Sequence, residues 1–286
     1  MHISRTSRIV AVGVTTLLAS LLTSCATSTS DSSATDPQTA DDLQHIHGLA
    51  VDPATDDLYA ATHRGVFKIE DGTAKLVGKG RQDTMAFTAI GATTFLASGH
   101  PVPGQDAVPH LGLIESTNGA RTWTTVSLEG EADFHVLEPT ADRLYGYDSQ
   151  SGALMSTVDR RTWKTLARAQ VLDLAADPTE PGHLLATTPE GIVRFKAGAE
   201  SDVVSRSPGI ALIDWPTAGT VVGVKPDGHV LTSNDQARTW QATGSLDGQV
   251  QALEATPNGW YVATSNGILT STDEGATWKT VLELAS

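Results

Sequence analysis

Histidine and aspartate side chains gather in the first half of this 286-residue chain, in a pattern that could bind a metal ion. His45 and His47 stand two residues apart, so they share one face if the segment is a strand. Imidazole nitrogen suits both Zn²⁺ and Cu²⁺, and a closed site needs about four donors. The predicted metal ligands are His45, His47, His63, His100, Asp133 and His135. The five histidines of that set, together with His110, are also the candidates for binding a small polar ligand.

The carboxylates of the same region permit a second interpretation, glycoside hydrolysis. That reaction uses two carboxyl groups roughly 5 to 9 Å apart, one of them with a raised pKa. Glu131 and Asp133 would lie about 6 to 7 Å apart along one strand face, and Asp83 would be their neighbour. We therefore keep Glu131, Asp133 and Asp83 as candidate catalytic residues. A third interpretation is that all these side chains only form hydrogen bonds and bind neither metal nor sugar.

A repeat of about 40 residues must position these side chains. Residues 271–278 read Ser-Thr-Asp-Glu-Gly-Ala-Thr-Trp, and related copies occur at 233–240, 116–123 and 156–163. Eroded copies fall at 195–201 and 69–73. Each unit also carries short β-branched or aromatic runs separated by turn residues, which indicates strands. Six such units fill residues 43–286, and a propeller blade takes roughly 40 residues. The sequence thus predicts one all-β domain, a β-propeller of six blades with four antiparallel strands each; five or seven blades are the alternatives.

The innermost strand of each unit would place the polar side chains at the central channel. We expect these strands at 45–48, 83–87 and 131–135 in the first three units. Leu172, Asp173, Asp214 and Gln251 occupy the corresponding strands of units four to six. His63 and His100 would end second strands at equivalent places. A proline-rich connection, residues 99–111, follows in the second unit, and long loops in compact folds are often functional. The sequence does not show how the ring closes.

The first 24 residues have the pattern of an export signal. Arg5 and Arg8 precede an apolar run that is too short to span a bilayer comfortably. Leu22 to Cys25 resembles a bacterial lipobox, which implies a lipid on Cys25. Residues 25–42 would then be a lipidated cysteine and a flexible tether, because almost no apolar side chain is present. We expect an exported protein, anchored by Cys25 to the outer face of the cytoplasmic membrane.

Composition excludes several classes of partner. The net charge is −14 and no cluster of Lys or Arg occurs, so nucleic acid is not an expected partner. A single Cys cannot form a disulfide within the chain. We expect a monomer whose partners are the membrane, through the lipid, and a metal ion, a glycan or another small polar ligand.

The repeated segment resembles the Asp-box of the sialidase-like (BNR) propeller families. Together with the lipobox and the His-x-His-Gly, Ser-Gly-His-Pro and Ala-Asp-Phe-His motifs, it resembles exported Gram-positive propeller lipoproteins labelled glycosylhydrolase-like. The Asp-box implies a fold more than a reaction. True sialidases carry an Arg-Ile-Pro segment and three clamping arginines; here that segment is missing, and only Arg64 and Arg81 lie near the cluster. A weaker similarity to the propeller assembly factor of photosystem II implies that such a fold can be a protein-assembly scaffold.

The sequence therefore predicts a surface-anchored propeller lipoprotein, not a true sialidase, that binds Zn²⁺, Cu²⁺ or a small polar ligand through blades one to three. A glycoside hydrolase is the first alternative and an assembly scaffold the second.

Overall fold

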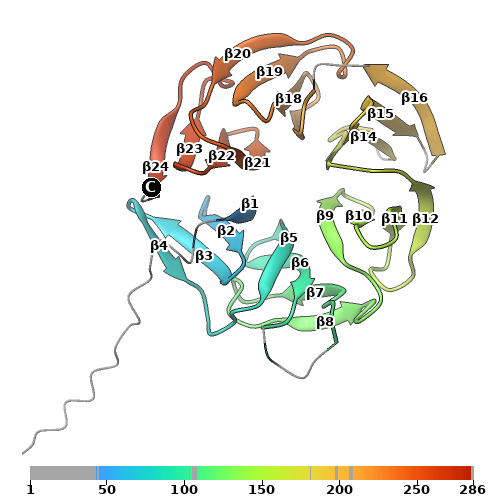
Figure 1. Ribbon diagram of the computed structural model, residues 1–286, viewed down its shortest axis with the longest axis vertical. Coiled ribbons are helices and arrows are strands. Elements are labelled where there is room, and N and C mark those ends of the chain that lie inside the picture. Colours follow the sequence, from blue (N-terminus) through green and yellow to red (C-terminus); the bar gives the residue numbers. More distant parts are fainter. Residues whose placement is uncertain are drawn as a thin grey trace, which may run out of the picture. The chain divides into compact units, whose positions relative to one another are not determined.

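Six four-stranded antiparallel sheets make up the described part of the chain. The computed structural model describes residues 43, 45–102, 104, 108–180, 182–196, 199–205 and 209–284. Within these residues, each sheet takes its four strands consecutively from the sequence. Figure 1 shows the sheets as the blades of a propeller around a central channel, with the first strand of each blade innermost. The prediction of an all-β, six-bladed propeller is confirmed, and the five- and seven-bladed alternatives are wrong.

The strands of each blade run from the channel outward. Blades 1 to 3 contain β1 (Ile46–Val51), β2 (Leu58–Thr62), β3 (Gly65–Glu70), β4 (Thr73–Leu76), β5 (Asp83–Gly91), β6 (Thr94–His100), β7 (Leu113–Ser116), β8 (Thr124–Ser127), β9 (Phe134–Pro139), β10 (Leu144–Asp148), β11 (Ala153–Thr157) and β12 (Lys164–Arg168). Blades 4 to 6 contain β13 (Asp173–Ala176), β14 (His183–Thr188), β15 (Gly191–Lys196), β16 (Ala199–Ser205), β17 (Leu212–Thr217), β18 (Thr220–Val224), β19 (His229–Ser233), β20 (Gln241–Ser245), β21 (Val250–Thr256), β22 (Gly259–Thr264), β23 (Gly267–Ser271) and β24 (Lys279–Glu283).

Burial follows the position of a strand within its blade. The second strands are buried on both faces, as in β2 and β10, because each sheet packs between two neighbouring sheets. Their apolar side chains therefore join cores shared by adjacent blades, such as the one that combines Tyr59 and Phe95. The outermost strands are largely exposed, as in β4 and β12. A short outer strand is a tolerable sheet edge since it offers few unpaired backbone groups.

The ring closes by side-chain packing and not by exchange of a strand. Leu49 and Phe67 of blade 1 share one core with Ala252 and Ile268 of blade 6. Across the same junction, the Ile46 backbone N–H donates to Gln251 Oε1 at 3.0 Å. Blade 6 is complete with β21 to β24, so no strand from the N-terminal end of the described chain takes part in it.

The Ser-to-Trp repeats lie in the turns between third and fourth strands, at the periphery. In the last copy, Asp273 Oδ1 accepts the Thr277 backbone N–H at 2.9 Å, and the Trp278 indole N–H donates to the Gly275 carbonyl at 3.0 Å. In the 156–163 copy, Asp159 accepts the equivalent backbone bonds from one position further along. These carboxylates therefore hold turns.

Residues 1–24, Cys25 and the tether to residue 42, with Asp106 of the proline-rich connection, lie outside the described residues. Among the described residues, the structure contains no helix long and apolar enough to cross a membrane.

Candidate functional site

The first three blades present their histidines and two aspartates at one rim of the ring, where the innermost strands begin. His45 directly precedes β1, Asp83 begins β5 and Asp133 directly precedes β9. The expected innermost strands at 45–48 and 83–87 are confirmed. The one at 131–135 was predicted too early, because Glu131 lies in an exposed turn whose backbone N–H bonds to Leu128. Glu131 thus does not share a strand face with Asp133 and His135.

Asp133 is the centre of one group, which we call the Asp133 site: His100, His110 and Asp133. Its ligand-type atoms all lie within 4.8 Å of one another. Asp133 Oδ1 is 3.6 Å from His100 Nε2 and 3.8 Å from His110 Nδ1. The Asp133 side chain is only 5% exposed. A buried carboxylate therefore faces two imidazole nitrogens.

The atoms that face one another in the Asp133 site lack ordinary partners. Asp133 Oδ1 and His110 Nδ1 are buried and have no hydrogen-bond partner among the described residues. His100 Nδ1 lies 3.1 Å from the Pro109 carbonyl oxygen, which can only accept, so Nδ1 carries the hydrogen. In a neutral ring, His100 Nε2 then points a lone pair at Asp133 Oδ1. Such an arrangement is favourable only with a cation or a proton between the atoms, because unpaired buried polar atoms are costly.

Other contacts fix Asp133 in this position. Its Oδ2 accepts from Ser149 Oγ at 2.9 Å and lies 3.2 Å from His135 Nε2. Its backbone N–H donates to the buried carboxylate of Asp148 at 3.0 Å. Burial by itself would raise the pKa of Asp133, but the hydrogen bonds from His135 and Ser149 outweigh it and hold the pKa below its usual range. Asp133 is therefore an anion at neutral pH.

The connection between β6 and β7 brings His110 to this site. The Leu111 backbone N–H donates to the Gly99 carbonyl at 2.8 Å, which closes the base of the connection. Gly99 itself has φ +147°, and a Cβ there would collide with the carbonyl oxygen of Asp83. Glycine thus lets β6 approach β5 closely where His100 leaves the strand. The proline-rich segment thus places His100 and His110 beside Asp133.

Three further imidazoles form a separate group, the blade 1 cluster: His45, His47 and His63, with Asp83 beside them. The ligand-type atoms of the three histidines also lie within 4.8 Å of one another. His47 Nε2 is 3.1 Å from His63 Nδ1, and His63 Nδ1 is 2.9 Å from Asp83 Oδ1. The His45 ring stacks on His63 with centroids 5.4 Å apart. Burial, followed by the nearby His63, lowers the pKa of His47 to about 4 and also lowers that of His45.

The histidines and aspartates predicted to form one site are thus divided between two. The blade 1 cluster and the Asp133 site adjoin at the β5–β6 pair, in which Asp83 and His100 are direct partners. His135 contacts Asp133 through Oδ2, the oxygen that does not face His100 and His110, and so helps to hold the carboxylate in place. Met85 lines the channel cavity.

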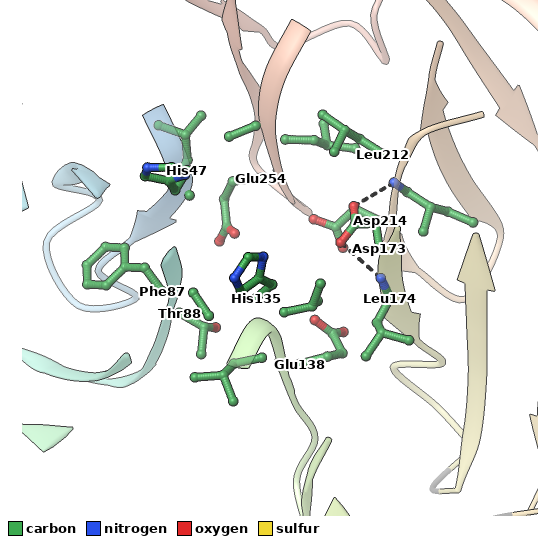
Figure 2. Close-up of a pocket in the computed structure, with 18 of the residues that line it drawn as sticks. His47, Phe87, Thr88, His135, Glu138, Asp173, Leu174, Leu212, Asp214 and Glu254 are labelled. Carbon is green, nitrogen blue, oxygen red and sulfur yellow. Dashed lines mark hydrogen bonds between the residues drawn. The ribbon is translucent and has the colours of Figure 1, made fainter. Parts of the chain in front are cut away.

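The channel itself contains carboxylates that sequence reasoning missed or passed over. A cavity of about 190 Å³ is lined by His47, His135 and several acidic side chains. Figure 2 shows the acidic side chains around this cavity; they are Glu138, Asp173, Asp214 and Glu254. The signal for Glu138 and Glu254 was a lone charge within the apolar innermost strands β9 and β21.

All four carboxylates bond to the backbone of the next blade around the ring, Glu254 to that of Val51 in blade 1. Glu138 accepts the Ala176 N–H at 2.9 Å, Asp173 accepts Ile213 N–H at 2.9 Å, and Asp214 accepts Ala255 N–H at 2.6 Å. Burial is the main cause of raised pKa values for all four. It raises the pKa of Asp173 to about 7, and with the repulsion of Asp214 it lifts Glu138 and Glu254 well above their usual range.

A third acidic group, in blade 4, is explained by its turn. Asp177 Oδ1 accepts the backbone N–H groups of Thr179 and Glu180, and His183 Nδ1 pairs with Glu180 at 2.8 Å. The side chains that could ligate an ion here already have partners.

Comparisons with known proteins concern the fold. No protein-family model and no curated protein sequence matches the chain. Among solved structures, YCF48 bound to a D1 peptide is 16% identical, covers 83% of this chain and 81% of its own, and has a TM-score of 0.51. A chain of the nidogen/laminin complex is 11% identical, with 76% and 89% covered and a TM-score of 0.60. The extracellular domain of BT4673 from B. thetaiotaomicron is 11% identical, with 83% and 33% covered and a TM-score of 0.54. At these identities the chain shares their propeller fold, and the likeness extends no further.

Proposed function

We propose that this propeller is an exported, lipid-anchored protein that binds a divalent transition-metal ion, Zn²⁺ or Cu²⁺, at the Asp133 site. His100 Nε2, His110 Nδ1 and Asp133 Oδ1 would be the ligands, and Ser149 and His135 would orient the carboxylate. Two imidazoles and one carboxylate suit both ions. Three protein ligands leave a coordination position open, which a water molecule or a small polar ligand would occupy.

The observation that carries this proposal is the set of unsatisfied atoms at the centre of the site. The separations of 3.6 and 3.8 Å compare with roughly 3.3 Å between neighbouring ligands of a tetrahedral ion bound at about 2.0 Å. A bound cation would satisfy Asp133 Oδ1, His110 Nδ1 and the lone pair of His100 together, whereas a proton on His100 would leave His110 Nδ1 unpaired.

Glycoside hydrolysis has less support from the same residues. It needs a carboxylic acid that is protonated near neutral pH, whereas the pKa of Asp133 lies below its usual range. Asp83 is engaged by His63, and Glu131 lies in an exposed turn.

Metal analysis of untagged protein tests the proposal directly. After incubation with Zn²⁺ or Cu²⁺ and removal of free ion, we expect stoichiometric metal in the wild type and its loss from the Asp133 site in His110→Ala. His229→Ala is the matched control, because His229 is an exposed residue of blade 5 that pairs only with Asp227 among the described residues. If His110→Ala retains as much metal as His229→Ala, the Asp133 site is not a metal site.

Anchoring is tested separately, at Cys25. We expect Cys25→Ser to remove the lipid mass and to move the protein out of the membrane fraction, because one thiol carries the acyl chains. Lipidation would be contradicted if Cys25→Ser stayed in the membrane fraction and its mass differed from that of the wild type only by the replaced atom.

A further inference from the structure

The blade 1 cluster contains a triangle of ligand-type atoms with the dimensions of a metal site. His47 Nε2, His63 Nδ1 and Asp83 Oδ1 are separated by 3.1, 2.9 and 3.5 Å. Neighbouring ligands of a tetrahedral ion bound at about 2.0 Å lie roughly 3.3 Å apart. The three atoms come from two blades.

Hydrogen bonds alone satisfy this triangle poorly. His63 Nδ1 has two close neighbours, His47 Nε2 and Asp83 Oδ1, and it carries either one hydrogen or one lone pair. If His63 Nδ1 carries a hydrogen and donates it to Asp83 Oδ1, no hydrogen remains there for His47 Nε2 to accept. If His47 Nε2 carries a hydrogen instead, its carboxylate acceptor, Asp83 Oδ1, is 3.5 Å away, which is long for a hydrogen bond. A single cation at the centre contacts all three atoms at once.

The surroundings hold the triangle in place. The side chain of His47 is 6% exposed, and its ring meets that of His63 edge to face with centroids 4.2 Å apart. Asp83 begins β5 and is paired there with His100. One ring nitrogen of His45 lies within 4.8 Å of one ring nitrogen each of His47 and His63, which makes His45 the candidate for a further donor.

We infer that the blade 1 cluster is a second metal site, formed by His47, His63 and Asp83 with His45 as the fourth donor, which fills independently of the Asp133 site. Its preferred ion is Zn²⁺ or Cu²⁺, since three imidazoles and one carboxylate are borderline donors for which both ions have high affinity. The two sites would lie on either side of the β5–β6 strand pair. Each has its own carboxylate, so neither ion depends on the other's ligands.

Stoichiometry in matched variants tests this inference. Untagged protein stripped with a chelator is titrated with Zn²⁺ or Cu²⁺ and analysed after free ion is removed. We expect two equivalents in the wild type and in His229→Ala, one in His63→Ala, one in His110→Ala and none in the double variant. His63 is 52% exposed and suited to substitution without disturbing the core. Asp83→Asn, which keeps the shape of the side chain, should also bind one equivalent. Thermal unfolding of each chelator-treated variant verifies that it is folded.

The two proposals fail in different ways. One equivalent in the wild type, lost in His110→Ala and unchanged in His63→Ala, would overturn the second site and leave the Asp133 site intact. One equivalent lost in His63→Ala alone would support the blade 1 site and contradict the Asp133 site. A single equivalent lost equally in both variants would mean one shared ion and would overturn independent filling. Copper(II) electron paramagnetic resonance adds a second readout, because coupling to three nitrogens is expected at the blade 1 site and to two at the Asp133 site.

Discussion

The rim of blades 1 to 3 and the channel beneath it both contain carboxylates from the innermost strands, but these carboxylates have different partners. In the channel, Glu138, Asp173 and Asp214 each accept a backbone N–H from the following blade. At the rim, Asp83 and Asp133 face imidazoles. A backbone bond joins two blades and is satisfied in the folded chain, whereas a carboxylate that faces imidazoles can receive a cation. A carboxylate at the inner end of a blade can therefore either join two blades or face imidazoles, depending on what the adjacent blade presents to it.

The largest expected effect tests the structural half of this comparison. Trp215 follows Asp214 on β17 and is 4% exposed in the core of blades 4 and 5. We expect Trp215→Ala to lower the free energy of unfolding by about 3 to 5 kcal/mol, because a large buried ring leaves a cavity. Chemical denaturation measures it. Trp215→Phe retains a ring and leaves a smaller cavity, so it should cost less than Trp215→Ala.

Both Trp215 variants should retain the same metal content as the wild type. If folded Trp215→Phe lost metal, then packing in the core of blades 4 and 5 would affect metal binding at the rim of blades 1 to 3.

The next effect is the pH dependence of stability, measured in chelator. A carboxyl group with a raised pKa in the folded state binds more protons there than in the unfolded chain, so the free energy of unfolding falls as pH rises through that range. The lowered pKa of His47 acts oppositely, but only between about pH 4 and 6.5. Since the pKa of Asp173 is about 7, this group alone should lower the free energy of unfolding by about 1 kcal/mol between pH 6.5 and 8, and the raised pKa values of Glu138 and Glu254 act in the same direction.

Glu138→Gln combined with Glu254→Gln should flatten that decline, because an amide keeps the acceptor oxygen and does not ionise. An equally steep decline in this double variant would show that Glu138 and Glu254 do not titrate between pH 6.5 and 8.

The smallest expected effect concerns a residue that orients a metal ligand without binding the ion itself. Ser149 donates to the outer oxygen of Asp133, so Ser149→Ala should weaken Zn²⁺ binding at the Asp133 site roughly tenfold, as loss of an outer contact does. Ser265 is the matched control: it follows β22 as Ser149 follows β10, and its backbone bonds to Gln249 as that of Ser149 bonds to Asp133. Competition titration with a chromophoric chelator measures both affinities. Equal affinities in Ser149→Ala and Ser265→Ala would contradict the orienting role.

The sequence predicted the fold well, because a repeat of about 40 residues reports on each blade separately. It also predicted which side chains gather, since His47, Asp83 and His100 lie at strand ends that the repeat aligns. It could not divide them into two groups. That division depends on the β5–β6 register and on the path of residues 99–111, which places His110 beside Asp133. Glu131 was misplaced because β9 begins three residues later than its pattern indicated.

Glu138 and Glu254 were overlooked for a different reason. A charge within an apolar run indicates a buried group that has a partner. The partner of Glu138 is a backbone N–H of the next blade, and the sequence cannot reveal it because every residue except proline has such a group. Ser149 could not be predicted either, because its role depends on the contact between its hydroxyl and Asp133 Oδ2.

Completion of every blade from consecutive strands has a consequence for the order of the chain. Because blade 6 meets blade 1 through packing and the Gln251–Ile46 bond, no sheet depends on where the polypeptide is opened. A circular permutant that starts at β5 and ends at β4 would keep all six sheets whole. It would need one new connection from β24 to β1, and residues 77–82 already make the equivalent passage from an outermost strand to the next innermost one. The blade 1 cluster would then be assembled from opposite ends of the reordered chain, because Asp83 would lie near its start and His45, His47 and His63 near its end.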